Sequence, residues 1–263
     1  MLEIIKELIS KRKLLFTMAI NDIKKRYLGS YLGILWAFIQ PLFTLCVMWF
    51  VFSVGFKAMP VEGVPFILWL AAGMVPWFFL SEILSSASYC IIENAYLVNK
   101  VVFPVGLLPV IKIISSLMVH LFFIGFLIFM FVIHGYDFQS SMIQIVYYSF
   151  AATMLMLAAS YITSSFTVFM KDFGQFIGVL IQFMFWATPI FWSLNMVPEE
   201  YRIWFYINPI LYVTEGYREA LIYNKWFWES PELCLYFWSF TVILLLVGRI
   251  VFNKLKPHFA DVL

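Results

Sequence analysis

The strongest constraint on this chain is a series of six long apolar runs. A helix needs about 20 mainly apolar residues to cross the hydrocarbon core of a bilayer. The runs are Ile34–Phe56, Val64–Ala87, Ile113–Ile133, Ile143–Met170, Phe173–Phe191 and Leu233–Phe252. Only 12% of the 263 residues are charged, about half the share in an average soluble domain. The sequence therefore predicts an all-α integral membrane protein with six transmembrane helices in a single domain, residues 1–263.

Lysine and arginine are divided unequally between the two sides of these predicted spans. If the N-terminus is cytoplasmic, seven Lys and Arg residues precede the first span and six more fall on the same side, out of 17 in the chain. A cytoplasmic excess of this kind is the usual topology signal of membrane proteins. We therefore expect a multi-pass membrane protein with both termini in the cytoplasm.

Residues 11–29, before the first span, are predicted to form an amphipathic helix in the cytoplasmic interface. The apolar side chains at helical spacing are Phe16, Ile20, Ile23 and Tyr27. Asp22 precedes Arg26 by four residues, which places the two charges on one helix face. Gly29 and Gly33 allow two interpretations: close helix packing, or a break between this helix and the first span.

Three cations, Lys24, Lys25 and Arg26, stand directly before the first span. They fit a topology signal, a membrane-surface anchor or a binding site for an anionic headgroup. Glu82 is the one carboxylate well inside a predicted span. Such a residue is either functional or a hydrogen-bonded packing residue.

Two connecting segments are predicted to have roles of their own. Residues 194–232, on the external side, are rich in Pro, Trp and Tyr and carry six Glu residues against three cations. Their apolar content predicts short helices that re-enter the membrane between spans five and six, covered by protein or water. The cytoplasmic loop 88–104 either packs on its own protein or docks a soluble partner.

Signatures of enzyme chemistry are absent from the sequence. It has no G-x-x-x-x-G-K-[ST] phosphate loop, no H-E-x-x-H and no G-x-S-x-G. The three histidines are far apart, and the three cysteines form neither a metal-binding nor a disulfide pattern. We expect no catalytic residues, no metal and no cofactor in this chain.

Six stretches resemble one known family in their order along nearly the whole chain. They are RYLGSYLGILWAFIQPLF (Arg26–Phe43), GMVPWFFLSE (Gly73–Glu82), ENAYLVNKVVFP (Glu93–Pro104), FWATPIFW (Phe185–Trp192), NPILYVTEGYREALI (Asn208–Ile222) and KLKPHFADVL (Lys254–Leu263). The chain resembles the permeases of bacterial polysaccharide ABC exporters, the Wzm and TagG type that serves O-antigen, teichoic acid or capsule.

The resemblance implies a transporter subunit rather than an enzyme. Two copies of the chain would pair with two ATPase subunits, which bind ATP and Mg²⁺. The cargo would be an undecaprenyl-diphosphate-linked polysaccharide that crosses the inner membrane among membrane lipids, with no role for nucleic acid. Two alternatives stay open: a membrane-embedded transferase acting on a lipid-linked glycan, and an ABC permease for a drug or small lipid.

The resemblance also assigns expected roles to residues. An arginine fork suits phosphate oxygens, so the substrate diphosphate is expected at Arg26, Tyr27 and Lys25. The expected channel lining, where aromatic rings stack on sugars, is Trp36, Phe38, Phe43, Phe185 and Trp186. The expected ATPase-coupling residues are Glu93, Asn94, Tyr96 and Lys100. The expected external gate residues are Tyr206, Asn208, Pro209, Glu215 and Arg218.

Overall fold

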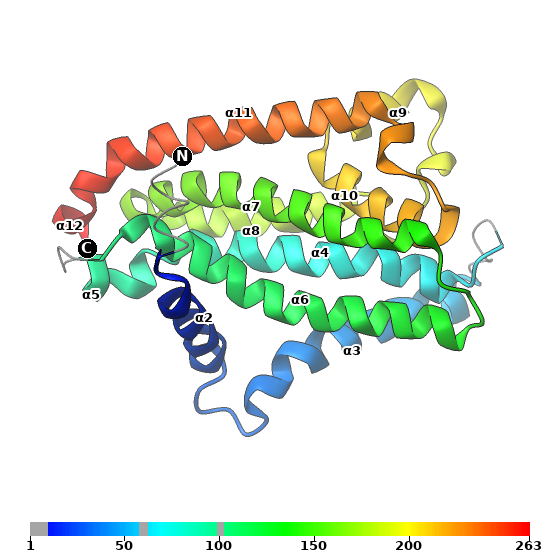
Figure 1. Ribbon diagram of the computed structural model, residues 1–263, viewed down its shortest axis with the longest axis horizontal. Coiled ribbons are helices and arrows are strands. Elements are labelled where there is room, and N and C mark those ends of the chain that lie inside the picture. Colours follow the sequence, from blue (N-terminus) through cyan, green and yellow to red (C-terminus); the bar gives the residue numbers. More distant parts are fainter. Residues whose placement is uncertain (1–9, 58–62, 99–102) are drawn as a thin grey trace.

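The computed structural model describes residues 10–57, 63–98 and 103–263 of the chain, and all its regular elements in those ranges are helices. Figure 1 shows the long helices running side by side, with α2 and α12 toward one end of the bundle and α9 at the other. Helix α4 is the central element, because it packs against α3, α6, α7, α8 and α10.

Five helical segments in the described ranges are long and apolar enough to cross a membrane. They are Gly33–Gly55 (which contains α3, Trp36–Phe50), α4 (Phe66–Ser88), Val105–Ile133 (with α6, Leu108–Ile133), Ser140–Phe169 (with α7, Gln144–Phe169) and Pro231–Val262 (with α11, Pro231–Leu255). The prediction of long membrane helices is confirmed for these five.

The sixth predicted span, Phe173–Phe191, corresponds to the shorter helix α8, Lys171–Ala187, of 17 residues. The helix ends early because Thr188 adopts an extended conformation, which is favoured directly before a proline such as Pro189. Helices α7 and α8 form a tight hairpin, since only the extended Met170 separates them. A sixth membrane crossing stays a prediction.

Helix α2, Arg12–Arg26, occupies most of the predicted interfacial segment and packs against α6. Its buried face is Leu15, Ala19 and Ile23, whereas Phe16 is exposed. The protein-facing side is therefore rotated from the predicted apolar face and shares only Ile23 with it.

Gly29 and Gly33 both have positive φ, +87° and +52°, and nothing lies within 4 Å of a Cβ added at either. Such backbone conformations favour glycine. The two glycines therefore break the chain between α2 and the first span, and neither makes a close helix contact within this subunit.

Helix α6 begins at Leu108, five residues before the predicted start of the third span at Ile113. Pro109 lies in the first turn, where a missing backbone N–H costs no helical hydrogen bond. As a result Lys112 belongs to the helix and is buried, although the sequence placed it in a connecting loop.

The segment predicted as external contains short helices, as expected. They are η6 (Leu194–Met196), α9 (Glu199–Tyr206), α10 (Pro209–Arg218), η7 (Glu219–Tyr223) and η8 (Phe227–Glu229). Helix α10 is largely buried against α4, α7 and α11, while α9 is not. The loop after α4 forms two short pieces, Ile92–Asn94 and α5 (Ala95–Val98), and the chain ends in α12 (Phe259–Val262).

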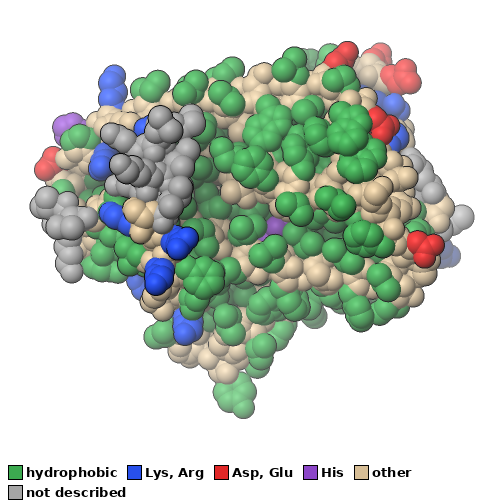
Figure 2. Space-filling model, in the orientation of Figure 1, with side chains coloured by type: hydrophobic (Ala, Val, Ile, Leu, Met, Phe, Trp, Pro, Cys, Tyr) green, Lys and Arg blue, Asp and Glu red, His purple; other side chains and the backbone are tan. Residues whose placement is uncertain are grey.

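Charged side chains gather at the two ends of the bundle. Figure 2 shows most of the visible Lys and Arg side chains at the end that holds α2, and most of the visible Asp and Glu side chains at the end that holds α9. Hydrophobic side chains cover the surface between these ends. This distribution matches a helical bundle that crosses a membrane along its long axis.

Candidate functional site

The end of α2 carries a network of ion pairs that we call the N-terminal cluster: Asp22, Arg26, Glu82, Glu93 and Lys112. The Arg26 guanidinium pairs with Asp22 at 2.7 Å and also with Glu82 on α4. The Lys112 ammonium on α6 lies 2.6 Å from Asp22 and 2.6 Å from Glu93, the latter in the loop after α4. The cluster therefore joins four segments through side chains alone.

The charges of the cluster stabilise one another. Burial alone raises the pKa of Asp22, but Arg26 and Lys112 outweigh it and hold the pKa of Asp22 below its ordinary value of 3.8. Burial likewise lowers the pKa of Arg26, but Glu82 and Asp22 outweigh it and raise that pKa. Both groups therefore stay ionised at neutral pH, and the cluster has two cations against three carboxylates.

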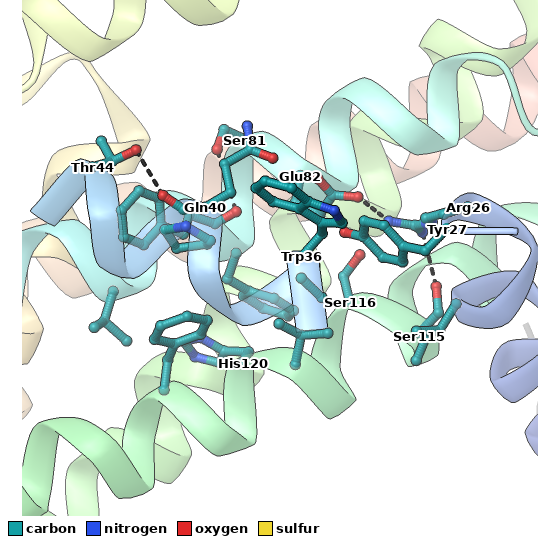
Figure 3. A pocket seen from close by; sticks show the side chains of 18 residues that line it. Arg26, Tyr27, Trp36, Gln40, Thr44, Ser81, Glu82, Ser115, Ser116 and His120 are labelled. Carbon is teal, nitrogen blue, oxygen red and sulfur yellow. Dashed lines mark hydrogen bonds and ion pairs between the residues drawn. The ribbon is translucent and has the colours of Figure 1, made fainter. Parts of the chain in front are cut away.

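A cavity of about 220 Å³ lies beside Arg26, between α2, α3, α4 and α6, and we call it the Arg26 cavity. Arg26, Tyr27 and Trp36 all line it, so the structure brings together two expected diphosphate residues and one expected channel residue. Figure 3 shows the three side chains with Glu82 at the same side of the cavity. Its remaining labelled polar side chains are Gln40, Thr44, Ser81, Ser115, Ser116 and His120.

Lys25 lies elsewhere. It lines a second cavity, of about 420 Å³, together with Glu93, Asn94 and Tyr96 from the loop after α4. The structure thus places the third expected diphosphate residue among the expected ATPase-coupling residues. Arg26 lines both cavities.

The coupling residues differ in how firmly they are held. Glu93 is bound to Lys112, and the Asn94 side-chain amide donates to the Cys90 carbonyl at 2.8 Å. Tyr96 is 57% exposed, which leaves its ring available to another molecule. Lys100 lies outside the described residues.

The five expected channel residues do not share one cavity. Phe38 packs edge-on against Phe122, with ring centroids 4.5 Å apart, and so contacts its own bundle. Phe185 packs against Phe191 and Trp77, while Phe43 and Trp186 are exposed. Within this subunit, only Trp36 is next to the Arg26 cavity.

Arg218, an expected gate residue, is the most deeply buried charge among the described residues. Its guanidinium donates to the carbonyl oxygens of Pro189 and Ile190, each at 2.6 Å, and to the Glu215 carboxylate at 2.5 Å. It also stacks over the Trp69 ring, 3.5 Å from the centroid. We call these residues the Arg218 cluster. It fixes α10 to α4 and to the chain after α8.

Gly73 makes this close approach possible. A Cβ added at Gly73 would lie 2.6 Å from the Arg218 Nη2 atom, inside van der Waals contact. The other four expected gate residues, Tyr206, Asn208, Pro209 and Glu215, line a third cavity of about 300 Å³. We call this the outer cavity.

Sequence reasoning missed the buried polar residues that hold these sites together. Lys112 belongs to the N-terminal cluster, and the Ser115 hydroxyl donates to Asp22 at 2.9 Å. His120 bonds the Tyr217 hydroxyl at 2.8 Å and so links α6 to α10. The available signal was Pro109, which is tolerated in a first helical turn and would have placed Lys112 inside α6. In the part of the chain that the structure describes, no group of His, Cys, Asp and Glu side chains could hold a metal ion.

Comparison with known proteins gives consistent relatives. An O-antigen export system permease protein RfbA from Klebsiella pneumoniae is 29% identical over 95% of both chains. A protein of the same name from Myxococcus xanthus is 23% identical over 99% of both. The polysialic acid transport protein KpsM of Escherichia coli is 23% identical over 89% of this chain and 90% of its own. The ABC-2 type transporter family matches residues 13–222, most of the chain. This protein is therefore a transport permease rather than an enzyme, and it belongs to the ABC-2 type transporter family.

Proposed function

We propose that this chain is the membrane subunit of an ABC exporter that moves an undecaprenyl-diphosphate-linked polysaccharide across a bacterial inner membrane. The names of its relatives support a polysaccharide cargo. The observation that carries the lipid-linked part is the Arg26 cavity, where Arg26 and Tyr27 face Trp36. A diphosphate there meets a guanidinium and a hydroxyl, and the adjoining sugar meets an aromatic ring.

Arg26 suits this role because its partners can be exchanged. Glu82 is half exposed, with 49% of its side chain accessible. A pair of this kind is worth only about 0–1 kcal/mol, so a diphosphate carrying more charge can replace Glu82 at the guanidinium. Asp22 keeps its second partner, Lys112, and is not left unpaired.

The N-terminal cluster also gives a path from the ATPase to the cargo. We expect the ATPase to bind ATP and Mg²⁺ and to dock at the loop that holds Glu93 and the exposed Tyr96. Glu93 holds Lys112, Lys112 holds Asp22, and Asp22 holds Arg26. A displacement of the loop therefore changes the partners of Arg26 through direct contacts, as physical coupling between sites requires.

Polar side chains on exposed helix faces support a dimer of this chain around a channel. Gln40 on α3, and Gln175 and Gln182 on α8, are exposed within this subunit. Polar side chains that contact lipid tails are unfavourable, so such residues usually face a polar cavity or another helix. We assign them to a channel between two copies, with α8 as a sixth crossing near the lower length limit. Helix α10 is then the re-entrant element, because it is shielded by α4, α7 and α11.

The test is ATP-dependent export by the permease reconstituted with its ATPase in vesicles loaded with lipid-linked glycan. We expect Arg26→Ala to reduce export by about tenfold or more, since a charge-assisted contact to phosphate contributes about 1.5–3 kcal/mol. Lys24→Ala is the matched control: an exposed cation two residues away that makes no ion pair among the described residues. Both variants should insert and assemble normally.

Two outcomes would contradict the proposal. Wild-type export by Arg26→Ala would remove the diphosphate role of Arg26. Export of an unrelated amphiphile in place of any lipid-linked glycan would favour a permease for a drug or small lipid.

A further inference from the structure

The outer cavity has the composition of a sugar-binding pocket. It lies where α9, α10, η7 and η8 meet the start of α11. Its volume, about 300 Å³, is at the lower end of the range for small-molecule sites. The aromatic side chains that line it are Trp69, Tyr206, Tyr212, Tyr223, Phe227 and Tyr236. Trp69, Tyr212 and Phe227 already stack on Arg218, Phe237 and Tyr147. The more exposed rings of Tyr206 and Tyr236 offer apolar faces to the C–H groups of a sugar.

Two carboxylates, Glu215 and Glu219, line the outer cavity among hydroxyl and amide side chains. Glu215 uses one carboxylate oxygen for Arg218, and Glu219 uses one for the Tyr148 hydroxyl at 3.4 Å. An ionised carboxylate only accepts, so a ligand that binds either group in its ionised form must bring donors, as sugar hydroxyl groups do. Tyr206 adds a hydroxyl that no other described residue holds.

Electrostatics oppose an anionic ligand at the same place. Residues 194–232 carry six Glu against Arg202, Arg218 and Lys225. Arg218 is already committed to Glu215 and to backbone oxygens, so Lys225 is the only cation that lines the cavity in the described chain. Burial and then Glu215 raise the pKa of Glu219 to about 7. One more negative charge is therefore already unfavourable there.

We propose that the outer cavity binds an uncharged sugar residue of the exported glycan and excludes polymers with an acidic group on every unit, such as polysialic acid or polyol phosphate. This inference rests on the proposed function and names the cargo class: a neutral glycan. The carboxylates select hydroxyl donors, the rings hold the sugar face, and the surrounding negative charge repels a polyanion.

The experiment uses the full-length chain with its ATPase partner in nanodiscs. Saturation-transfer NMR, which suits weak sugar binding, measures contact with a short neutral galacto-oligosaccharide or manno-oligosaccharide and with a sialic acid oligomer of equal length. We expect saturation transfer from the protein to the neutral sugars and none to the sialic acid oligomer. Tyr206→Ala and Glu219→Gln should each weaken neutral-sugar binding by up to about tenfold, the effect of about 1.4 kcal/mol.

Matched controls come from α9. Tyr201→Ala and Glu200→Gln change the same residue types outside the outer cavity and should leave binding unchanged. Equal transfer to both oligosaccharides, transfer to neither, or full binding by Tyr206→Ala and Glu219→Gln would overturn the proposal. A Glu219→Lys variant that gains sialic acid binding would support its electrostatic part.

Export measured on the same preparations separates this inference from the proposed function. Normal ATP-dependent export of a lipid-linked glycan, with no saturation-transfer signal from sugar at the outer cavity, contradicts only this inference. A preparation could instead show a saturation-transfer signal that Tyr206→Ala abolishes, while it exports no lipid-linked glycan. This result would support the binding site and contradict the proposed function.

Discussion

The N-terminal cluster and the Arg218 cluster hold arginine side chains in different ways. Arg218 is fully buried and is bound by backbone carbonyls of Pro189 and Ile190 as well as by Glu215. Arg26 is bound only by side chains and lines two cavities. Both clusters contact α4, at Trp69 and at Glu82, positions about 20 Å apart along the helix axis at 1.5 Å per residue.

This difference suits the two arginines to different roles: Arg218 can fix helices to one another, whereas Arg26 can exchange its partners. Carbonyl oxygens are part of the backbone, so Arg218 can leave them only if α10 and the chain after α8 move apart. The carboxylates around Arg26 can rotate away or accept another cation without any change of backbone. A cation held by side chains is suited to a ligand that comes and goes, whereas one held by the backbone is suited to fixing helices.

The largest expected effect is at Arg218. Arg218→Leu leaves Glu215 and two carbonyl oxygens without their donor inside the protein, and loss of one partner of a buried pair costs about 3–5 kcal/mol. We expect a large drop in the thermal midpoint in detergent, or no folded protein. Arg218→Lys should rescue little, because an ammonium does not reproduce the fork. Arg249→Leu is the control, and a wild-type midpoint for Arg218→Lys would contradict the anchoring role.

A smaller loss is expected at Lys112 in the N-terminal cluster. Lys112→Met removes one of the two cations that bind Asp22 and the cation that binds Glu93. Asp22 keeps Arg26, and Glu93 is half exposed to water, so we expect a loss of about 2 kcal/mol. Adding Asp22→Asn to Lys112→Met should cost less than the two single changes together, since the residues share one interaction. If the loss of unfolding free energy in the double variant equals the sum of the losses in the two single variants, the two residues do not share an interaction.

The pH dependence of stability follows from Asp22. Its pKa is lower in the folded protein than its ordinary 3.8, so its stabilising contribution is complete well above pH 3.8 and is lost as the pH falls through the folded value. The raised pKa of Arg26 matters only at extreme alkaline pH. Thermal midpoints of wild type and Asp22→Asn should therefore converge on acidification below about pH 4. A difference in thermal midpoint between the two proteins that stays constant at every pH would contradict the stabilising role of ionised Asp22.

The smallest effect on stability is expected at Glu82. Glu82→Gln removes a half-exposed partner of Arg26 and should change the unfolding free energy by less than about 1 kcal/mol. The same change removes the group that competes with phosphate for the guanidinium. Native mass spectrometry should then detect tighter binding of a short-chain polyprenyl diphosphate to Glu82→Gln. Weaker binding would mean that Glu82 assists the lipid rather than competes with it.

Local sequence patterns predicted those structural features that depend only on residues close together in the chain. The apolar runs located the five long helices, and the i, i+4 spacing predicted the pair of Asp22 and Arg26, which the structure confirms. The partners of Lys112 and Arg218 could not be predicted in this way. Asp22 lies 90 residues from Lys112, and the backbone oxygens that bind Arg218 carry no signature of residue type. The early end of α8 was predictable in principle from Pro189.

The close approach of Gly73 to Arg218 limits how this pair of positions can evolve. Any side chain larger than hydrogen at position 73 would displace the guanidinium, and without the guanidinium the space beside residue 73 would be empty. Substitution at either position alone is therefore disfavoured. In homologous chains we expect positions 73 and 218 to change together, with a larger residue at the first accompanying a smaller, uncharged residue at the second.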